Sequence, residues 1–275
     1  MELDSKGRFR TKYCPCKKSN KDGKFVPYKG YENKGYCHSC DKTFLPDGNT
    51  YIPEFKKKVY KPKHYFQKEY LKEMLFDYEG EQNNFVYFLH TTLGFERTNM
   101  ILKKYFLGTG SSNSVLFPHI DNTGNIVALK YMMYDKTTGK RYNTIWFDDA
   151  VAPRHKPCLF GLHLVNKSDK PIAIVESEKS TCLMSDFNPC YTWTSCGGSK
   201  GLTDEKIAPL NHKTVHLFPD HDKYDLWTER KLELEKKYPF IDFEISRECE
   251  IWFNEGKINK GDDIADYYLQ YNRNM

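Results

Sequence analysis

Apolar residues recur at the three-to-four-residue spacing of an amphipathic helix over residues 65–107, and this pattern predicts core helices there. The next stretch has the shorter period of strands. Residues 114–121 and 126–135 flank an Asn-Thr-Gly-Asn turn and predict a β-hairpin, and residues 141–147 follow a second turn and predict a further strand. His90 lies in the helical stretch, and we assign it to the core rather than to any chemistry.

From residue 171 onward, short apolar strands alternate with amphipathic helices. The predicted strands are residues 171–176, 190–194, 214–220 and 240–246. The predicted helices are residues 177–187, 204–210, 225–238 and 264–272. This alternation indicates a wound, parallel α/β sheet, in which functional groups lie at the carboxyl ends of the strands.

Composition adds a charge asymmetry to this outline. The chain has 275 residues, enough for two domains or for one large domain with an appendage. Residues 1–72 contain 18 Lys and Arg against 8 Asp and Glu, whereas the remaining 203 residues contain 24 against 29. A basic head joined to an acidic body suggests a module that binds a polyanion, and the aromatic residues among its charges favour a surface on which bases stack.

The absence of long apolar runs excludes several classes of protein. The chain contains no run of about 18 apolar residues, so no membrane-spanning helix is predicted. The first ten residues contain no apolar stretch typical of a secretory signal, so we expect no membrane partner. The chain has nine cysteines, and this odd number without a signal favours a reducing compartment over a disulfide framework.

Four of the cysteines are spaced as the ligands of a structural zinc ion. The two close pairs form the pattern C-x-C-x20-C-x2-C and consist of Cys14, Cys16, Cys37 and Cys40. The segment between the pairs predicts short strands joined by glycine turns, as in a zinc ribbon. Because about 50 polar residues bury too little surface to fold alone, we expect Zn²⁺ to stabilise this part. The first pair is separated by one residue instead of the usual two, which leaves His38 as an alternative ligand.

Acidic residues follow the predicted parallel strands at the edge where functional groups are expected. Glu176 follows the first strand, Asp220 and Asp222 follow the third, and Asp262 and Asp263 precede the last helix. Carboxylates crowded at one edge repel each other unless a cation neutralises them. Oxygen ligands of this kind suit Mg²⁺ or Mn²⁺. The alternative is that single acids only cap helices, a role open to Asp222 and Asp263.

Two short motifs resemble the TOPRIM domain shared by DnaG-type primases, topoisomerases and related nucleases. They are Ile-Val-Glu-Ser-Glu-Lys-Ser at residues 174–180 and Leu-Phe-Pro-Asp-His-Asp at residues 217–222. The TOPRIM pattern has a Glu after the first strand, Asp-x-Asp after the third, and a further acid downstream. The matching residues are Glu176, Asp220, Asp222 and, for the last element, Asp262 or Asp263. Ser177 stands where the family usually has glycine, so the turn there must be made differently.

The resemblance extends upstream into a segment that precedes TOPRIM in bacterial primases. Its motifs match Val-Leu-Phe-Pro-His-Ile-Asp at residues 115–121, Arg-Tyr-Asn at residues 141–143 and Leu-Phe-Gly-Leu at residues 159–162. The variant Glu-x-Glu-Lys that contains Glu178 and Lys179 is similar to phage and organellar primases. The chain looks closer still to uncharacterised TOPRIM-containing proteins of Bacteroidota genomes and mobile elements. No P-loop motif occurs, so we expect no motor activity in this chain.

The resemblance to a DnaG-type primase core implies an α+β and α/β architecture with four parts. These are a zinc ribbon at residues 1–48, a linker at 49–64, a basic and β-rich primase-like subdomain at 65–165, and a TOPRIM domain at 166–275. The helical stretch that begins at residue 65 has no clear counterpart in primases.

The resemblance also implies a function, namely metal-dependent nucleotidyl transfer on a single-stranded DNA template, as in primer synthesis. Glu176, Asp220 and Asp222 would be catalytic and, together with Asp262 and Asp263, would hold Mg²⁺ or Mn²⁺. Nucleoside triphosphates or template phosphates would be contacted by Lys130, Arg141 and Lys179. A separate replicative helicase is a further partner that fits this function, and the expected location is the cytoplasm of a bacterium, with the gene on the chromosome, a phage or a mobile element.

Two other functions remain open from the sequence. The first is a non-catalytic module that binds nucleic acid or recruits another protein through a decayed TOPRIM fold, which the Ser177 departure favours. The second is a TOPRIM nuclease in which Glu176 acts as a general base beside the metal ions.

Overall fold

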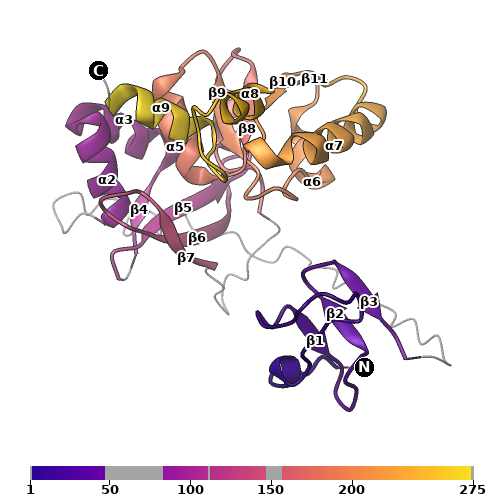
Figure 1. Cartoon of the computed structure of the whole chain (residues 1–275). Coiled ribbons are helices and arrows are strands. Elements are labelled where there is room, and N and C mark those ends of the chain that lie inside the picture. The colour runs from indigo at the N-terminus through magenta and orange to yellow at the C-terminus, as the bar shows by residue number, and fades with distance from the viewer. Residues whose placement is uncertain (1, 47–82, 111, 147–156, 274–275) are drawn as a thin grey trace. The chain divides into compact units, whose positions relative to one another are not determined.

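The computed structural model describes residues 2–46, 83–110, 112–146 and 157–273 (Figure 1). The chain divides into two compact units, Met1–Val59 and Tyr60–Met275. The linker predicted at residues 49–64, and the part of the predicted helical stretch before residue 83, lie outside the described residues. In the described part of the chain, no helix has the length and apolar character needed to cross a membrane.

The first unit contains a small antiparallel sheet of three strands in the order β1-β2-β3. Its elements are η1 (Gly7–Phe9), β1 (Phe25–Pro27), β2 (Gly35–Cys37) and β3 (Lys42–Phe44). The buried side chain of Asn20 organises the loops, because its Nδ2 donates to the carbonyls of Arg8, Thr11 and Phe25. The hydrophobic core consists of little more than Cys14, Phe25 and Cys37, which is too little apolar surface to fold this unit unaided.

Two helices open the described part of the second unit, as the helical spacing predicts. They are α2 (Asn84–Leu93) and α3 (Phe95–Tyr105). Asn83 caps α2 by accepting a hydrogen bond from the Val86 amide at 3.0 Å. Gly94, with φ of +83°, makes the turn between the helices that a side chain would strain.

An antiparallel sheet of four strands follows, in the order β4-β5-β6-β7. The strands are β4 (Gly108–Thr109), β5 (Val115–Ile120), β6 (Ile126–Tyr134) and β7 (Arg141–Trp146). The predicted hairpin is confirmed as β5 and β6. The Asp121 carboxylate holds its turn by accepting from the amides of Thr123 and Asn125, both at 2.9 Å.

The remaining strands form a parallel sheet in the order β11-β10-β8-β9, which confirms the predicted wound architecture. The strands are β8 (Ile172–Val175), β9 (Thr192–Ser195), β10 (Thr214–Leu217) and β11 (Asp242–Ile245). The helical elements around them are α4 (Leu162–Val165), α5 (Glu178–Phe187), α6 (Asp204–Ile207), η2 (Ala208–Leu210), η3 (His221–Lys223), α7 (Tyr224–Lys237), α8 (Glu248–Asn254) and α9 (Ile264–Arg273). The pattern did not predict α8, which lies between β11 and α9.

Two hydrophobic clusters cover this parallel sheet. One includes residues of α5 and α9 together with α2, α3 and the β5–β6 hairpin, and the other includes Trp227 and Leu234 of α7. Because both faces of the sheet are buried, its polar chemistry is confined to the ends of the strands.

The two sheets of the second unit share one core. Phe160 and Ser195 exchange backbone hydrogen bonds of 3.0 and 3.1 Å, and the buried Tyr105 hydroxyl donates to the Trp193 carbonyl at 3.0 Å. Arg97 of α3 also pairs with Asp186 of α5. The hairpin and the parallel sheet are therefore held in one arrangement.

A chain truncated to residues 60–275 is expected to fold and to unfold at the same urea midpoint as the main transition of the full chain, because its core contains no residue of the first unit. Circular dichroism against urea concentration measures this. As a control, Trp193→Ala in the truncated chain should lower the free energy of unfolding by about 3–5 kcal/mol. A truncated chain without a cooperative transition would contradict the division into units.

Candidate metal centres

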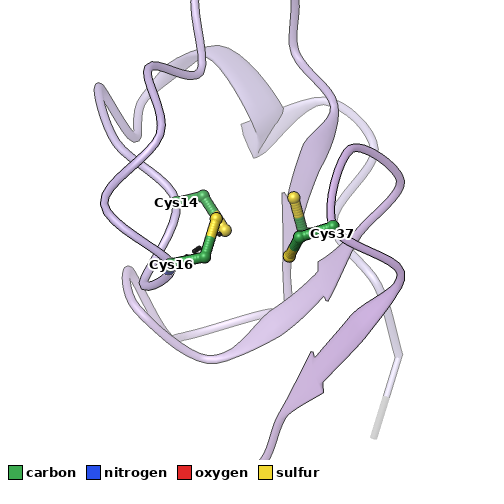
Figure 2. Close-up of side chains that lie close together, drawn as sticks. Cys14, Cys16 and Cys37 are labelled. Carbon is green, nitrogen blue, oxygen red and sulfur yellow. Dashed lines mark hydrogen bonds between the residues drawn. The ribbon is translucent and has the colours of Figure 1, made fainter.

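The four paired cysteines converge in the first unit. Figure 2 shows the side chains of Cys14, Cys16 and Cys37 directed toward one another, the first two from the loop before β1 and the third from the end of β2. The sulfur atoms of these three and of Cys40 all lie within 4.8 Å of one another. The sequence left His38 open as a ligand, but the gathered set consists of cysteines, and the His38 ring instead contacts Tyr36 with centroids 4.7 Å apart.

Local turns explain how the unusually close first pair still presents both sulfurs. The Lys17 amide donates to the Cys14 carbonyl at 2.8 Å, and the Cys14 amide donates to the Lys18 carbonyl at 2.9 Å. Lys17 adopts a left-handed φ of +68°, which completes the tight knuckle. The Cys16 amide also donates to Cys14 Sγ at 3.4 Å.

The chemistry of this donor set fits zinc. Hydrogen bonding from Cys14 lowers the pKa of Cys16 to about 7, whereas burial raises the pKa of Cys14, so a bound metal ion would displace the proton that this close pair retains. Four cysteine sulfurs at this separation match the tetrahedral ligand set of structural zinc sites, with Zn–S bonds of about 2.3 Å. The four-cysteine group therefore supports structural zinc binding, which would compensate for the small core of this unit.

The second candidate centre lies at the carboxyl end of the parallel sheet. Strands β8 and β10 are neighbours, with Ile174 opposite Leu217. Glu176 follows the end of β8 directly, and Asp220 lies three residues after the end of β10. The parallel register therefore brings the first and second predicted acidic positions to the same edge.

Burial and mutual repulsion act on both carboxyl groups. Burial, with added repulsion from Asp222 and Asp263, raises the pKa of Glu176 to about 7 against the opposing charge of Lys223. Burial, followed by repulsion from Asp263 and Glu176, raises the pKa of Asp220 to about 8. The direction of both shifts is the one expected for carboxyl groups that are partly desolvated near other negative charges.

Neither group is occupied by a structural role. Among the described residues, Glu176 Oε1 is buried without a hydrogen-bond partner. Asp220 precedes η3, but its side chain makes no capping hydrogen bond. Buried carboxylate oxygens are normally satisfied, so this pair is open to a cation.

The other predicted acids differ in position and in availability. Asp222 is exposed and pairs with Lys223 at 2.6 Å. Asp263 caps α9, because its Oδ1 accepts from the amides of Ala265 and Asp266, and its Oδ2 accepts from the Ser180 hydroxyl. The capping role left open by the sequence is thus confirmed for Asp263, although its charge also raises the pKa of Glu176 and of Asp220.

Asp262 lies beside this centre in a different role. Its Oδ2 accepts from the Asn259 amide at 2.7 Å and helps to close the turn before α9. The charge of Asp263 raises the pKa of both Glu176 and Asp220, whereas no such effect is found for the charge of Asp262. Asp263 is therefore the downstream acid that faces the centre.

The carboxylates are less closely gathered than the cysteines. Within the described ranges, only the four cysteines place three or more ligand atoms close enough to enclose a metal ion. Magnesium does not require such a cage, since it is usually held by one or two carboxylates, waters and substrate phosphates. The orphaned oxygen of Glu176 and the crowded Asp220 fit that mode of binding.

A polar cavity of about 390 Å³ is lined by Asp263 and by two of the predicted basic residues, Arg141 and Lys179, whereas Glu176 and Asp220 are not among its lining residues. Burial lowers the pKa of Lys179, but the charges of Asp263 and Asp266 outweigh it and raise the pKa overall. Lys179 Nζ donates to Asp266 Oδ1 at 2.9 Å. The full lining is Tyr134, Thr138, Gly139, Lys140, Arg141, Ser177, Lys179, Lys260, Gly261, Asp262, Asp263 and Asp266.

Lys130 has a different environment from the one predicted for a phosphate contact. Its side chain is only 5% exposed, and its Nζ lies 2.7 Å from Oε1 of the buried Glu178. His119 Nε2 lies 3.6 Å from the same oxygen. Burial would raise the pKa of Glu178, but His119 and Lys130 outweigh it and lower the pKa. Because Lys130 is engaged in this buried ion pair, we do not propose that it contacts phosphate.

Sequence reasoning missed three residues of this centre. Lys140 and Lys260 line the cavity, and Asp266 pairs with Lys179 and adds to the repulsion at Asp220. Asp266 lies three positions after Asp263, so helical spacing could have placed both on one face. Lys140 lies in a predicted turn and Lys260 lies shortly before the last predicted helix, and lysine gives no distinguishing signal at either place.

Comparisons with known proteins give one family and several structures. A family model described as "Domain of unknown function (DUF6371)" matches residues 83–221. No curated protein matches the chain.

The similar solved structures are primases at low sequence identity. The primase fragment of the bacteriophage T7 primase-helicase protein is 16% identical, with 95% of each chain covered and a TM-score of 0.43. The RNA polymerase domain of Mycobacterium tuberculosis primase DnaG is 14% identical, with 75% of this chain and 74% of that chain covered and a TM-score of 0.40. The Aquifex aeolicus primase, with its zinc binding and RNA polymerase domains, is 13% identical, with 75% and 53% covered and a TM-score of 0.41. All three TM-scores are below 0.5, so the overall structural similarity is limited.

Cys37→Ser is expected to abolish zinc binding and to unfold the first unit, because one sulfur of the four-cysteine set is lost. The purified wild-type chain should contain about one zinc ion, and elemental analysis measures this. Cys190→Ser is the matched control, since Cys190 is exposed and outside the set, and it should retain zinc. Retention of zinc by Cys37→Ser would contradict the assignment.

Without added divalent ion, the contribution of Glu176 and Asp220 to stability is expected to become less favourable as pH rises from about 4 to about 8. Glu176 and Asp220 have pKa values of about 7 and about 8, above the ordinary 4.5 and 3.8, so the folded state holds more protons than the unfolded state over this range. Asp220→Asn should therefore raise the melting temperature by about 2–4 °C at pH 8.5 and leave it unchanged near pH 4.

Thermal unfolding followed across this pH range measures the effect. The control is Glu229→Gln on the exposed face of α7, which should follow the wild-type curve. An Asp220→Asn chain that is less stable than wild type at pH 8.5 would contradict the repulsion.

Proposed function

The chain belongs to the family described as Domain of unknown function (DUF6371), and within that family we propose that it is a primase-type nucleotidyltransferase that uses divalent metal ions to copy single-stranded DNA. The proposal takes the parallel sheet and its helices to be a TOPRIM domain, as the motifs at residues 174–180 and 217–222 indicate. It takes the four-part division inferred from the sequence as its domain organisation.

One observation carries the proposal most directly. Glu176 and Asp220 meet at adjacent strand ends, are raised in pKa by burial and by neighbouring acids, and are not engaged in capping or ion pairing among the described residues. Holding like charges together costs stability. Such a cost is typical of a site kept for function rather than for folding.

The polar cavity supplies the complementary charge. Lys140, Arg141, Lys179 and Lys260 line it beside Asp263 and Asp266. A cavity that combines cations with acids suits a substrate that carries both phosphates and metal ions, such as a nucleoside triphosphate. We assign Arg141 and Lys179 to the phosphates.

Glu176 and Asp220 would hold Mg²⁺ or Mn²⁺, with Asp222 within reach if its pair with Lys223 opens. When bound, the ion would activate the attacking 3′-hydroxyl and stabilise charge on the transferred phosphoryl group. Asp263 would contribute negative charge while it fixes the start of α9.

The first unit has features of a surface for single-stranded DNA. Phe9 is 70% exposed and Tyr13 is 65% exposed, in a segment rich in Lys and Arg. Exposed aromatic rings stack bases, and the basic side chains bind the backbone in a salt-dependent way. We propose this unit as the template-binding module.

The test is a primer-synthesis assay with single-stranded DNA, labelled nucleoside triphosphates or deoxynucleoside triphosphates, and Mg²⁺ or Mn²⁺. Asp220→Asn and Glu176→Gln should each reduce product at least about 100-fold, because metal-assisted charge stabilisation contributes several kcal/mol. Asp262→Asn should have a smaller effect, since its oxygen serves the turn before α9. Glu229→Gln is the matched control and should leave activity unchanged.

The same assay separates the proposal from its alternatives. Degradation of the DNA that Asp220→Asn abolishes would favour a nuclease. Binding of DNA without synthesis or degradation would favour a non-catalytic module. Either result would overturn the proposed primase activity.

A further inference from the structure

His221 lies between the two acids of the Asp-x-Asp motif, in η3, and is only 9% exposed. The TOPRIM pattern leaves this central position unspecified, and no role for it followed from the sequence. Its side chain nevertheless contacts two other elements of the fold.

The first contact is a hydrogen bond to the loop before α9. The Gly261 amide donates to His221 Nδ1 at 3.3 Å. Because Nδ1 accepts this bond, the neutral ring has its proton on Nε2. Gly261 has φ of +88°, a conformation that favours glycine. It lies immediately before Asp262 and Asp263 in the chain.

The second contact is with α8. The rings of His221 and Phe253 are 4.3 Å apart between centroids, with an interplanar angle of 34°. Phe253 therefore supports the imidazole from one face, and the ring is held with Nδ1 toward Gly261.

These contacts join the two loops that carry the acids. Asp220 and Asp222 flank His221 on one loop, and Asp263 lies two residues after Gly261 on the other. The 3.3 Å hydrogen bond from Gly261 to His221 shows that the two loops approach closely, and the charge of Asp263 is one of the causes that raise the pKa of Asp220. Repulsion between the carboxylates acts to separate the loops, and the Gly261–His221 hydrogen bond opposes that separation.

We propose that His221 is a positioning residue that sets the spacing between the Asp220 loop and the Asp263 loop, and through it the affinity of the carboxylate centre for a divalent ion. This inference rests on the proposed function, since it concerns the same metal centre. His221 itself binds neither the ion nor the substrate in this role.

Two substitutions separate the hydrogen bond from simple packing. His221→Phe keeps a ring against Phe253 but removes the acceptor for Gly261. His221→Asn removes the ring but places an acceptor, Oδ1, the same number of bonds from the backbone as Nδ1. A packing role predicts that Phe is tolerated and Asn is not, whereas the positioning role predicts the reverse.

The measurement is binding of Mn²⁺ alone to the full-length chain, followed by electron paramagnetic resonance of the free ion. Asp220→Asn defines which part of the binding belongs to the carboxylate centre. In that part, His221→Phe should weaken affinity about tenfold, the loss typical of a residue that orients metal ligands, and His221→Asn should stay within about twofold of wild type.

Each outcome bears on a different claim. If wild-type binding does not depend on Asp220, the proposed metal centre is wrong and this inference fails with it. If binding depends on Asp220 but His221→Phe matches wild type, the positioning role alone is wrong. Equal weakening by both His221 variants would show that the acceptor for Gly261 does not by itself set the affinity, and would also overturn the inference.

Amide exchange of the wild-type chain keeps the inference testable even if a variant does not fold. The Gly261 amide should be protected from exchange by its bond to His221. Exchange at the rate of an unstructured amide would overturn the proposal.

Discussion

Repulsion between carboxylates at one edge of a parallel sheet is the constraint on which this molecule depends. Ile174 pairs with Leu217, so the chain segments after β8 and β10 leave the sheet at the same level. Glu176 and Asp220 follow these two neighbouring strands, and the charge of Glu176 is one of the causes that raise the pKa of Asp220. The hydrophobic clusters on both faces of the sheet keep the strands in place and so maintain this unfavourable arrangement.

The structure balances part of that charge through the helices on one face of the sheet. Helix α5 begins next to Glu176, and it joins the start of α9 through Ser180 to Asp263 and through Lys179 to Asp266. Lys179 pairs with Asp266 and hydrogen bonds satisfy Asp263, whereas in the described part of the chain Glu176 Oε1 has no hydrogen-bond partner and the Asp220 side chain makes no capping bond. The acids of the centre thus fall into two groups. Asp263 and Asp266 are engaged in helix capping or an ion pair, and Glu176 and Asp220 are available for a cation.

Much of this organisation was accessible from the sequence, because it follows from local periodicity. The alternation after residue 171 predicted the parallel sheet, and the two strands that Glu176 and Asp220 follow are neighbours in it. The spacing of the cysteines likewise predicted the gathered set of four. Each of these inferences needs only residues that are near in sequence or a rule about parallel strands.

Other features could not be predicted because they depend on partners distant in sequence. Lys130 lies in β6, where five successive residues from Ile126 are buried, so alternation could not show which way its side chain points. Its partner Glu178 lies 48 positions away. Asp262 and Asp263 both precede the last helix, and only the bonds to Ala265, Asp266 and Ser180 distinguish them.

The buried pair of Lys130 and Glu178 has an evolutionary consequence. Loss of either member alone would strand a charge in the interior at a cost of about 3–5 kcal/mol, whereas replacing both with apolar residues could be neutral. Descendants of this chain are therefore expected to change the two positions together, by a near-simultaneous double replacement.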